Sequence, residues 1–123
     1  MVGKFLGRNH MYTESRPWGL FSVLRESPKY KVKLITVNPG GKLSSQSHKH
    51  RSEHWLIVRG KPTVTINGLV QPYNERSYVD VPRGVIHRLE NTTEDTVEII
   101  ETQFGDYLGE DDIIRYDDIY GRT

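Results

Sequence analysis

Short runs of alternating apolar and polar residues, separated by turn-forming residues, recur along most of the chain. These runs are rich in Val, Ile, Thr and Tyr, which favour extended strands. We expect strands over residues 19–26, 30–37, 53–60, 62–68, 77–81, 86–92 and 96–104. Because helical periodicity is scarce, the pattern predicts an all-β sandwich or barrel.

The segments between these runs carry turn chemistry. They include Asn-Pro-Gly-Gly at 38–41, Asn67-Gly68 and Pro-Arg-Gly at 82–84. The Asn67-Gly68 pair predicts a tight hairpin in which both central residues have positive φ.

The C-terminal segment, residues 105–123, differs in character from the strands before it. Its acidic residues stand beside isoleucines and tyrosines, which argues against a disordered acidic tail. We expect a short helix or an extended, ordered arm. We interpret Asp111 or Asp112 as the cap of such a helix, which would cover one opening of the barrel.

The length of 123 residues predicts one domain, with a core at about 16–104 and an arm at 105–123. The formal net charge of +1 gives no overall field that would favour a nucleic-acid or membrane partner. The absence of cysteine excludes disulfides, thiolate nucleophiles and cysteine-based zinc sites. The N-terminus lacks the apolar centre of a signal peptide, and no apolar run approaches the roughly 20 residues of a membrane span. We therefore expect a cytoplasmic protein.

Three of the five histidines lie in the stretch QSHKHRSEHW, residues 46–55. His48 and His50 are two residues apart, so on an extended strand both side chains would leave the same face. His87 lies on another expected strand, and Glu53 adds a carboxylate. Three imidazoles and a carboxylate suit one divalent ion, Zn foremost and otherwise Mn, Co, Ni or Fe, with open positions for water or substrate. The alternative is that these are ordinary surface or core histidines.

The stretches HKHRSEHWLIVRG and VPRGVIHRLEN resemble the two motifs of the cupin superfamily. The first is a His-x-His pair with a downstream acid and glycine. The second is Pro-x-Gly-x-x-His-x-x-x-Asn, met here by Pro82, Gly84, His87 and Asn91. The resemblance implies a double-stranded β-helix, a jelly-roll-like barrel, around a metal.

The first motif departs from the cupin pattern at the acid. Only two residues separate His50 from Glu53, where three or four are usual. Glu53 occupies the position of the acidic ligand when the motif is counted back from Gly60. His54 occupies that position when the motif is counted forward from His50. We favour Glu53 as the fourth ligand, after His48, His50 and His87, because it shares a strand face with Trp55, which we expect to fill the barrel. A bulge would reverse this choice.

A closer resemblance covers most of the chain. The segments RPWGLFSVL (16–24), LSSQSHKHRSEHWLIVRG (43–60) and GDYLGEDDIIRYDDIYGR (105–122) are similar to the type II phosphomannose isomerase family. In that family this cupin is usually the C-terminal domain of a bifunctional enzyme of GDP-mannose biosynthesis. The resemblance implies metal-dependent interconversion of mannose 6-phosphate and fructose 6-phosphate through an enediol. Nothing resembles the nucleotide-binding half, so we expect an isomerase cupin standing alone.

This chemistry needs a group that transfers a proton and groups that bind the sugar phosphate. The candidates for proton transfer are His54, Glu101 and Lys33, although a solvated strand face is the alternative for the last two. The candidates for substrate binding are Arg16, Gln46, Arg51 and Arg88. Gln46 could also bind the ion. Arg88 points away from the face of His87 and would have to act from the rim.

Two other functions fit the same motifs. One is a different metal-dependent cupin enzyme, such as an oxygenase or an isomerase of another sugar phosphate. The other is a non-catalytic sugar-binding or regulatory cupin. For the isomerase cupin we expect a homodimer joined through edge strands, because such pairing removes exposed sheet edges.

Overall fold

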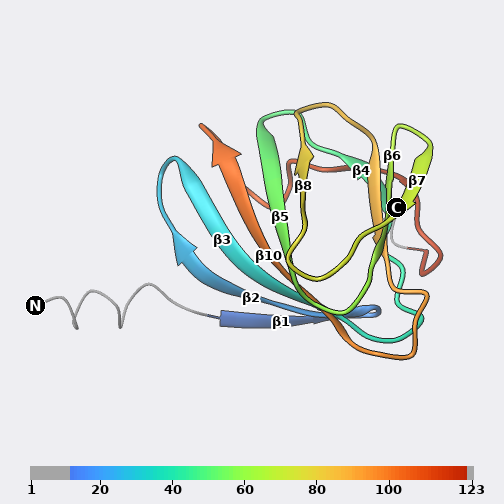
Figure 1. Cartoon of the computed structure of the whole chain (residues 1–123). Helices are drawn as coiled ribbons and strands as arrows, with labels where there is room; N and C mark the ends of the chain where they lie inside the picture. Colours follow the sequence, from blue (N-terminus) through green and yellow to red (C-terminus); the bar gives the residue numbers. More distant parts are fainter. Residues whose placement is uncertain (1–11, 122–123) are drawn as a thin grey trace, which may run out of the picture.

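Two antiparallel sheets face each other across a shared interior in the computed structural model, which describes residues 12–121 (Figure 1). The larger sheet has the strand order β1-β2-β3-β10-β5-β8, and the smaller has the order β11-β4-β9-β6-β7. The strands are β1 (Tyr12–Arg16), β2 (Gly19–Glu26), β3 (Tyr30–Val37), β4 (Ser45–Ser47), β5 (Arg51–Arg59), β6 (Thr63–Ile66), β7 (Leu69–Pro72), β8 (Tyr78–Val81), β9 (His87–Glu90), β10 (Val97–Gly105) and β11 (Ile114–Asp117). The prediction of an all-β barrel is confirmed.

The alternating runs located seven of these strands and missed four, namely β1, β4, β7 and β11. The missed strands have three to five residues each. All four residues of β7 are exposed, so its sequence carries no alternation between a buried and an exposed face. Short edge strands of this kind depend on pairing with a neighbour more than on their own pattern.

The hairpin between β6 and β7 has the predicted turn. Asn67 has φ 49° and Gly68 has φ 84°, and they connect the paired residues Ile66 and Leu69. Positive φ at both central residues matches the right-handed twist of the flanking strands.

The inner face of the large sheet changes from apolar to polar along its strands. One row of paired residues, Phe21, Ile35, Ile99 and Ile57, crosses β2, β3, β10 and β5, and all four side chains are buried. Burial of each such side chain contributes on the order of 1.5–3 kcal/mol to stability.

The next two rows on the same face carry charged and amide groups. They comprise Lys33, Glu101 and Trp55 in one row, and Lys31, Gln103 and Glu53 in the other. All six side chains are buried. Half of the interior is therefore a hydrophobic core, and the other half is a polar chamber.

The chain after β10 crosses from the large sheet to the small one (Figure 1). There β11 pairs with β4, with Arg115 opposite Gln46. No helix forms within residues 105–121, so the extended alternative holds for this described part of the segment. No described helix is long and apolar enough to cross a membrane.

The interpretation of Asp112 as a helix cap is wrong, and Asp111 caps no helix either. The Asp112 carboxylate instead accepts hydrogen bonds from the backbone N–H groups of Lys49, at 2.8 Å, and His50, at 2.9 Å. It therefore fixes the loop that connects β4 to β5.

Asn91 ties three segments together at the apolar end of the barrel. Its Nδ2 donates to the carbonyl oxygens of Val37, at 3.1 Å, and Asp95, at 2.7 Å. Its Oδ1 accepts from the backbone N–H of Thr93 at 3.0 Å. This motif residue therefore has a structural role outside the chamber.

We predict that Asn91→Ala lowers the free energy of unfolding by about 3 kcal/mol, because it leaves buried backbone groups without partners. Urea denaturation would measure the change. Asn74→Ala is the matched control, since Asn74 is exposed and its side chain makes no hydrogen bond within the described residues. Equal effects of the two substitutions would contradict the role assigned to Asn91.

Candidate metal centre and substrate pocket

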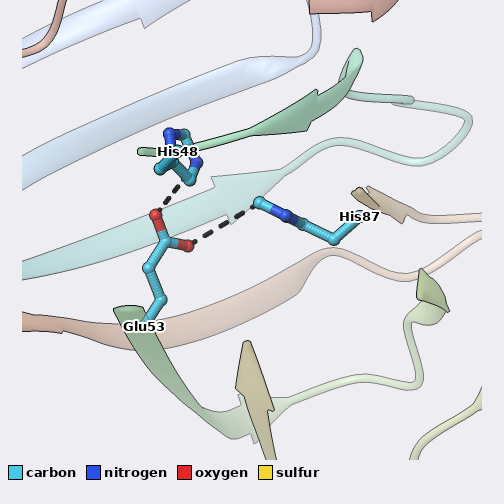
Figure 2. A group of neighbouring side chains, drawn as sticks. All are labelled: His48, Glu53 and His87. Atoms are coloured by element: carbon cyan, nitrogen blue, oxygen red, sulfur yellow. Dashed lines mark ion pairs between the residues drawn. The ribbon is translucent and has the colours of Figure 1, made fainter. Parts of the chain in front are cut away.

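Two histidines and a glutamate from three parts of the chain meet inside the polar chamber (Figure 2). One ligand atom from each of His48, Glu53 and His87 can be chosen so that all lie within 4.8 Å of one another. His48 Nε2 is 3.2 Å from Glu53 Oε2, and His87 Nε2 is 3.9 Å from Glu53 Oε1. All three side chains are buried.

Backbone carbonyl groups orient both imidazole rings. Nδ1 of His48 donates to the carbonyl oxygen of Asp112 at 2.7 Å, and Nδ1 of His87 donates to that of Val85 at 3.0 Å. Because a carbonyl only accepts, the proton of each neutral ring is on Nδ1. Both Nε2 lone pairs then face the Glu53 carboxylate. Arg51, whose Nη2 lies 3.3 Å from His48 Nε2, offsets part of the resulting repulsion, and a cation among the three donor atoms would offset the rest. The donor set and its orientation therefore fit a divalent metal.

The Glu53 carboxylate is ionised in spite of its burial. Burial alone would raise its pKa, but the charge of the neighbouring Arg51 guanidinium outweighs this effect and lowers the pKa to about 2. Arg51 Nε donates to Oε2 at 2.7 Å, and the Trp55 indole N–H donates to Oε1 at 2.9 Å. Burial also lowers the pKa of His48, which keeps that ring in the neutral form that metals bind.

A pocket opens beside this group of three residues. Its lining includes Arg16, Gln46 and Arg51 from the predicted substrate-binding set, together with Lys33 and Glu101. Lys33 and Glu101 are buried, so the alternative of a solvated strand face is wrong for both. The sequence did not decide whether Lys33 is buried or solvated, because β3 also carries apolar residues on its opposite face.

Glu101 is the acid in this pocket whose pKa is raised, whereas the pKa values of Glu53 and Glu110 are lowered. Burial, followed by the charge of Glu53, raises its pKa to about 7, against the opposing effects of Lys33 and Arg51. Its Oε2 accepts a hydrogen bond from Gln103 Nε2 at 2.6 Å. A carboxyl group that titrates near neutral pH can both accept and donate a proton.

Lys33 is held between an aromatic ring and a carboxylate. Its Nζ lies 4.2 Å from the centre of the Phe21 ring and 2.8 Å from Glu110 Oε2. Glu110 also accepts from the buried Lys31 at 3.2 Å. The C-terminal segment thus supplies the counter-charge for both buried amines.

Three of the predicted site residues, His50, His54 and Arg88, lie outside both the pocket and the group of His48, Glu53 and His87. His50 is exposed, because β4 ends at Ser47 and the chain bends at Lys49 and His50, so it does not share a face with His48. His54 lies on the outer face of β5, 3.0 Å from Asp80. The roles predicted for His50 and His54 stay predictions, and the geometry brings neither ring to the group.

Arg88 lies on the outer face of β9, opposite to His87. Its Nε donates to the carbonyl oxygen of Leu43 at 2.9 Å, and its Nη2 lies 3.0 Å from Asp117 Oδ2. It therefore connects β9 to β11. Its predicted role in substrate binding remains a prediction.

The sequence did not single out two residues of the C-terminal segment, Glu110 and Arg115, that also line the pocket. Their inward position follows from the path of the chain and the pairing of β11, which a helix or a free arm would not have given. Along this segment Ile113 and Arg115 alternate with the exposed Ile114 and Tyr116. This alternation is the one feature of the sequence that could have predicted a strand with Arg115 on its inner face.

The two facing sheets and the buried donor set define the class of this protein as a cupin, a double-stranded β-helix. A solved structure of a protein with a double-stranded β-helix domain from Klebsiella pneumoniae has the same fold, with a TM-score of 0.74 and 18% identity over 85% of this chain and 84% of that chain. Residues 6–118 match the family described as mannose-6-phosphate isomerase C-terminal, and the chain belongs to this family. The resemblance found in the motifs is thereby confirmed.

Relatives of this chain are larger proteins. It is 45% identical over 116 residues to mannose-1-phosphate guanylyltransferase ManC of Salmonella typhimurium. The aligned region covers 94% of this chain and 24% of the relative. It is 44% identical over 121 residues to the alginate biosynthesis protein AlgA of Pseudomonas putida, and the aligned region covers 98% of this chain and 25% of the relative. The chain spans about a quarter of the length of these curated relatives.

Metal binding gives a direct test of which histidines are ligands. We predict that His48→Ala, Glu53→Gln and His87→Ala each weaken Zn²⁺ binding by more than the roughly 10–100-fold typical of losing an outer-shell partner. Calorimetric titration of the metal-free protein would measure the affinity. His50→Ala and His54→Ala should leave it nearly unchanged, because the structure holds both rings outside the group. A large loss in His50→Ala would instead show that the loop rearranges to bring this ring to the ion.

Proposed function

We propose that this domain is a metal-dependent aldose–ketose isomerase that interconverts mannose 6-phosphate and fructose 6-phosphate. The observation that carries the proposal is the convergence in one pocket of a metal-type donor set, a carboxyl group with a pKa near 7 and several cationic side chains. Membership of the mannose-6-phosphate isomerase C-terminal family supports it further.

The isomerisation moves one proton between two adjacent carbon atoms of the open-chain sugar and a second proton between the oxygen atoms that they carry. A divalent ion held by His48, Glu53 and His87 would stabilise the negative charge that develops on the two neighbouring oxygen atoms. Zn²⁺ fits this nitrogen and carboxylate donor set, as do Mn²⁺, Co²⁺, Ni²⁺ and Fe²⁺. Gln46 lines the same pocket opposite His87, where its amide can contact a substrate hydroxyl or contribute a further ligand.

Glu101 is the group that we assign to proton transfer. It lies in the row next to Glu53 on the inner face of the large sheet, and it lines the pocket. In its ionised form it would take the proton from one carbon atom, and in its neutral form it would return the proton to the other. Lys33 is its paired neighbour on β3 and can balance the charge of the ionised form.

The exclusion of bulk water favours this transfer. Lys33 and Glu101 are both buried, and the C-terminal segment covers the same end of the barrel through Glu110. In such surroundings a proton exchanges between acid and substrate with less competition from solvent.

The first experiment measures turnover of mannose 6-phosphate after the protein has been stripped with chelator and resupplied with single divalent ions. We predict that at least one ion restores the formation of fructose 6-phosphate, and that His87→Ala is inactive with the same ion. Absence of turnover with every ion, in folded protein that binds metal, would favour the sugar-binding or regulatory cupin. Oxygen consumption in the presence of Fe²⁺ would favour the oxygenase.

The role of Glu101 predicts a specific kinetic defect. Glu101→Gln should lower kcat by about 10²–10⁴-fold, the usual contribution of a general acid–base group, and should retain metal binding. Glu98→Gln is the matched control, because Glu98 lies on the same strand and its side chain leaves the opposite face. Equal activity of the two variants would contradict the assignment.

The pH dependence of the wild-type enzyme tests the same residue. Activity should rise with pH as Glu101 ionises, with a midpoint between the ordinary glutamate pKa of 4.5 and about 7. A cation bound to Glu53 would offset part of the charge that raises the pKa, which moves the midpoint below 7. This limb of the profile should be absent from the residual activity of Glu101→Gln.

A further inference from the structure

One cation among the described residues that line the pocket has no acidic partner. Arg16 lies 3.0 Å from Glu14, Lys33 lies 2.8 Å from Glu110, and Arg51 lies 2.7 Å from Glu53. The guanidinium of Arg115 makes no ion pair or side-chain hydrogen bond with any residue in the range 12–121, and its Nε is buried without a partner.

The strand register directs Arg115 into the pocket. Arg115 on β11 pairs with Gln46 on β4, which in turn pairs with His87 on β9. Residues paired across antiparallel strands share a sheet face, so Arg115 lies on the face of the metal-type histidine. Its neighbours Ile114 and Tyr116 are exposed, as alternation along a strand requires.

The group of His48, Glu53 and His87, called here the metal-type group, is separated from Arg115 by a distance that suits one ligand in contact with both. Two strand spacings separate the backbones of His87 and Arg115, or about 10 Å. A hexose phosphate whose first two oxygen atoms lie at the His48, Glu53 and His87 group can reach β11 with its phosphate over such a distance.

The neighbouring strands fix the backbone of β11 on both sides of Arg115. The hydroxyl groups of Tyr116 and Ser47 are hydrogen-bonded at 2.9 Å. Arg88 Nη2 donates to the carbonyl oxygen of Asp117 at 2.9 Å from the outer face of β9. These contacts hold the strand from which the Arg115 side chain extends, so that its backbone needs no rearrangement for the guanidinium to face the pocket.

The second buried donor without a partner among the described residues of this pocket, Arg51 Nη1, comes from β5 in the large sheet. Its guanidinium contacts Glu53 and His48, so it belongs to the metal-type group. The carboxylate of Glu110, which would repel an anion, is neutralised by Lys31 and Lys33. Arg115 is therefore the cation most available for a second anionic group.

We propose that Arg115 binds the phosphate monoester of the substrate through its planar guanidinium, and that β11 forms the phosphate subsite. The identity of the substrate rests on the proposed function, whereas the affinity of this subsite for phosphate does not. Guanidinium groups bind phosphate oxygens in pairs, a geometry that a lysine cannot reproduce.

Binding of inorganic phosphate tests the subsite without turnover. The metal-free wild-type protein, Arg115→Gln and Arg83→Gln would be titrated with phosphate by calorimetry. Arg83 is an exposed arginine outside the pocket lining, so its substitution removes the same charge and should leave the affinity unchanged. Arg115→Gln should bind phosphate about tenfold to a hundredfold more weakly. An unchanged affinity in Arg115→Gln, or no phosphate binding by the wild type, would overturn the proposal.

Kinetics then separate this proposal from the proposed function. For mannose 6-phosphate, Arg115→Gln should raise KM by the same factor and change kcat little, and Arg115→Lys should recover part of the loss. Turnover of unphosphorylated mannose should not respond to the substitution. Phosphate binding that depends on Arg115 in a protein without isomerase activity would contradict the proposed function and leave the phosphate subsite supported. Isomerase activity with an unchanged KM in Arg115→Gln would contradict the phosphate subsite and leave the proposed function supported.

Discussion

The burial of one ionised carboxylate, that of Glu53, constrains the rest of this domain. A charge removed from water is costly unless ion pairs and hydrogen bonds replace its hydration. Arg51 and Trp55 supply those bonds, and they must be buried with it. One end of the barrel therefore cannot be filled with aliphatic side chains. The same ionised carboxylate, next to His48 and His87, gives this end a donor set that suits a metal.

The same constraint explains why the C-terminal segment belongs to the domain. Lys31 and Lys33 are buried amines, and Glu110 is a common acidic partner for both. Although Glu110 itself is exposed, its loss would leave two buried amines without this acidic partner, which is destabilising. Asp112 adds hydrogen bonds to the loop that holds His48. The segment thus closes the polar chamber and keeps its charges balanced.

Sequence patterns predicted the fold and part of the site for an identifiable reason. The period of two along a strand placed Trp55 on the face of Glu53, and both are buried. The same argument failed for His50, because a spacing determines a face only where the backbone is extended, and β4 ends at Ser47. It also could not find Arg115, whose orientation depends on the pairing of β11 with a strand some 70 residues earlier in the chain.

The charge of the pocket differs from that of the whole chain in a way that bears on substrate choice. The whole chain has a formal net charge of +1, which favours no class of partner. Four cationic side chains and three carboxylates line the described pocket, and a pKa near 7 leaves one carboxylate, that of Glu101, partly neutral at neutral pH. A divalent ion would add two further positive charges. The pocket is then complementary to a dianion, while the surface outside it exerts little attraction, so selection for a phosphorylated sugar over a neutral sugar would arise inside the barrel.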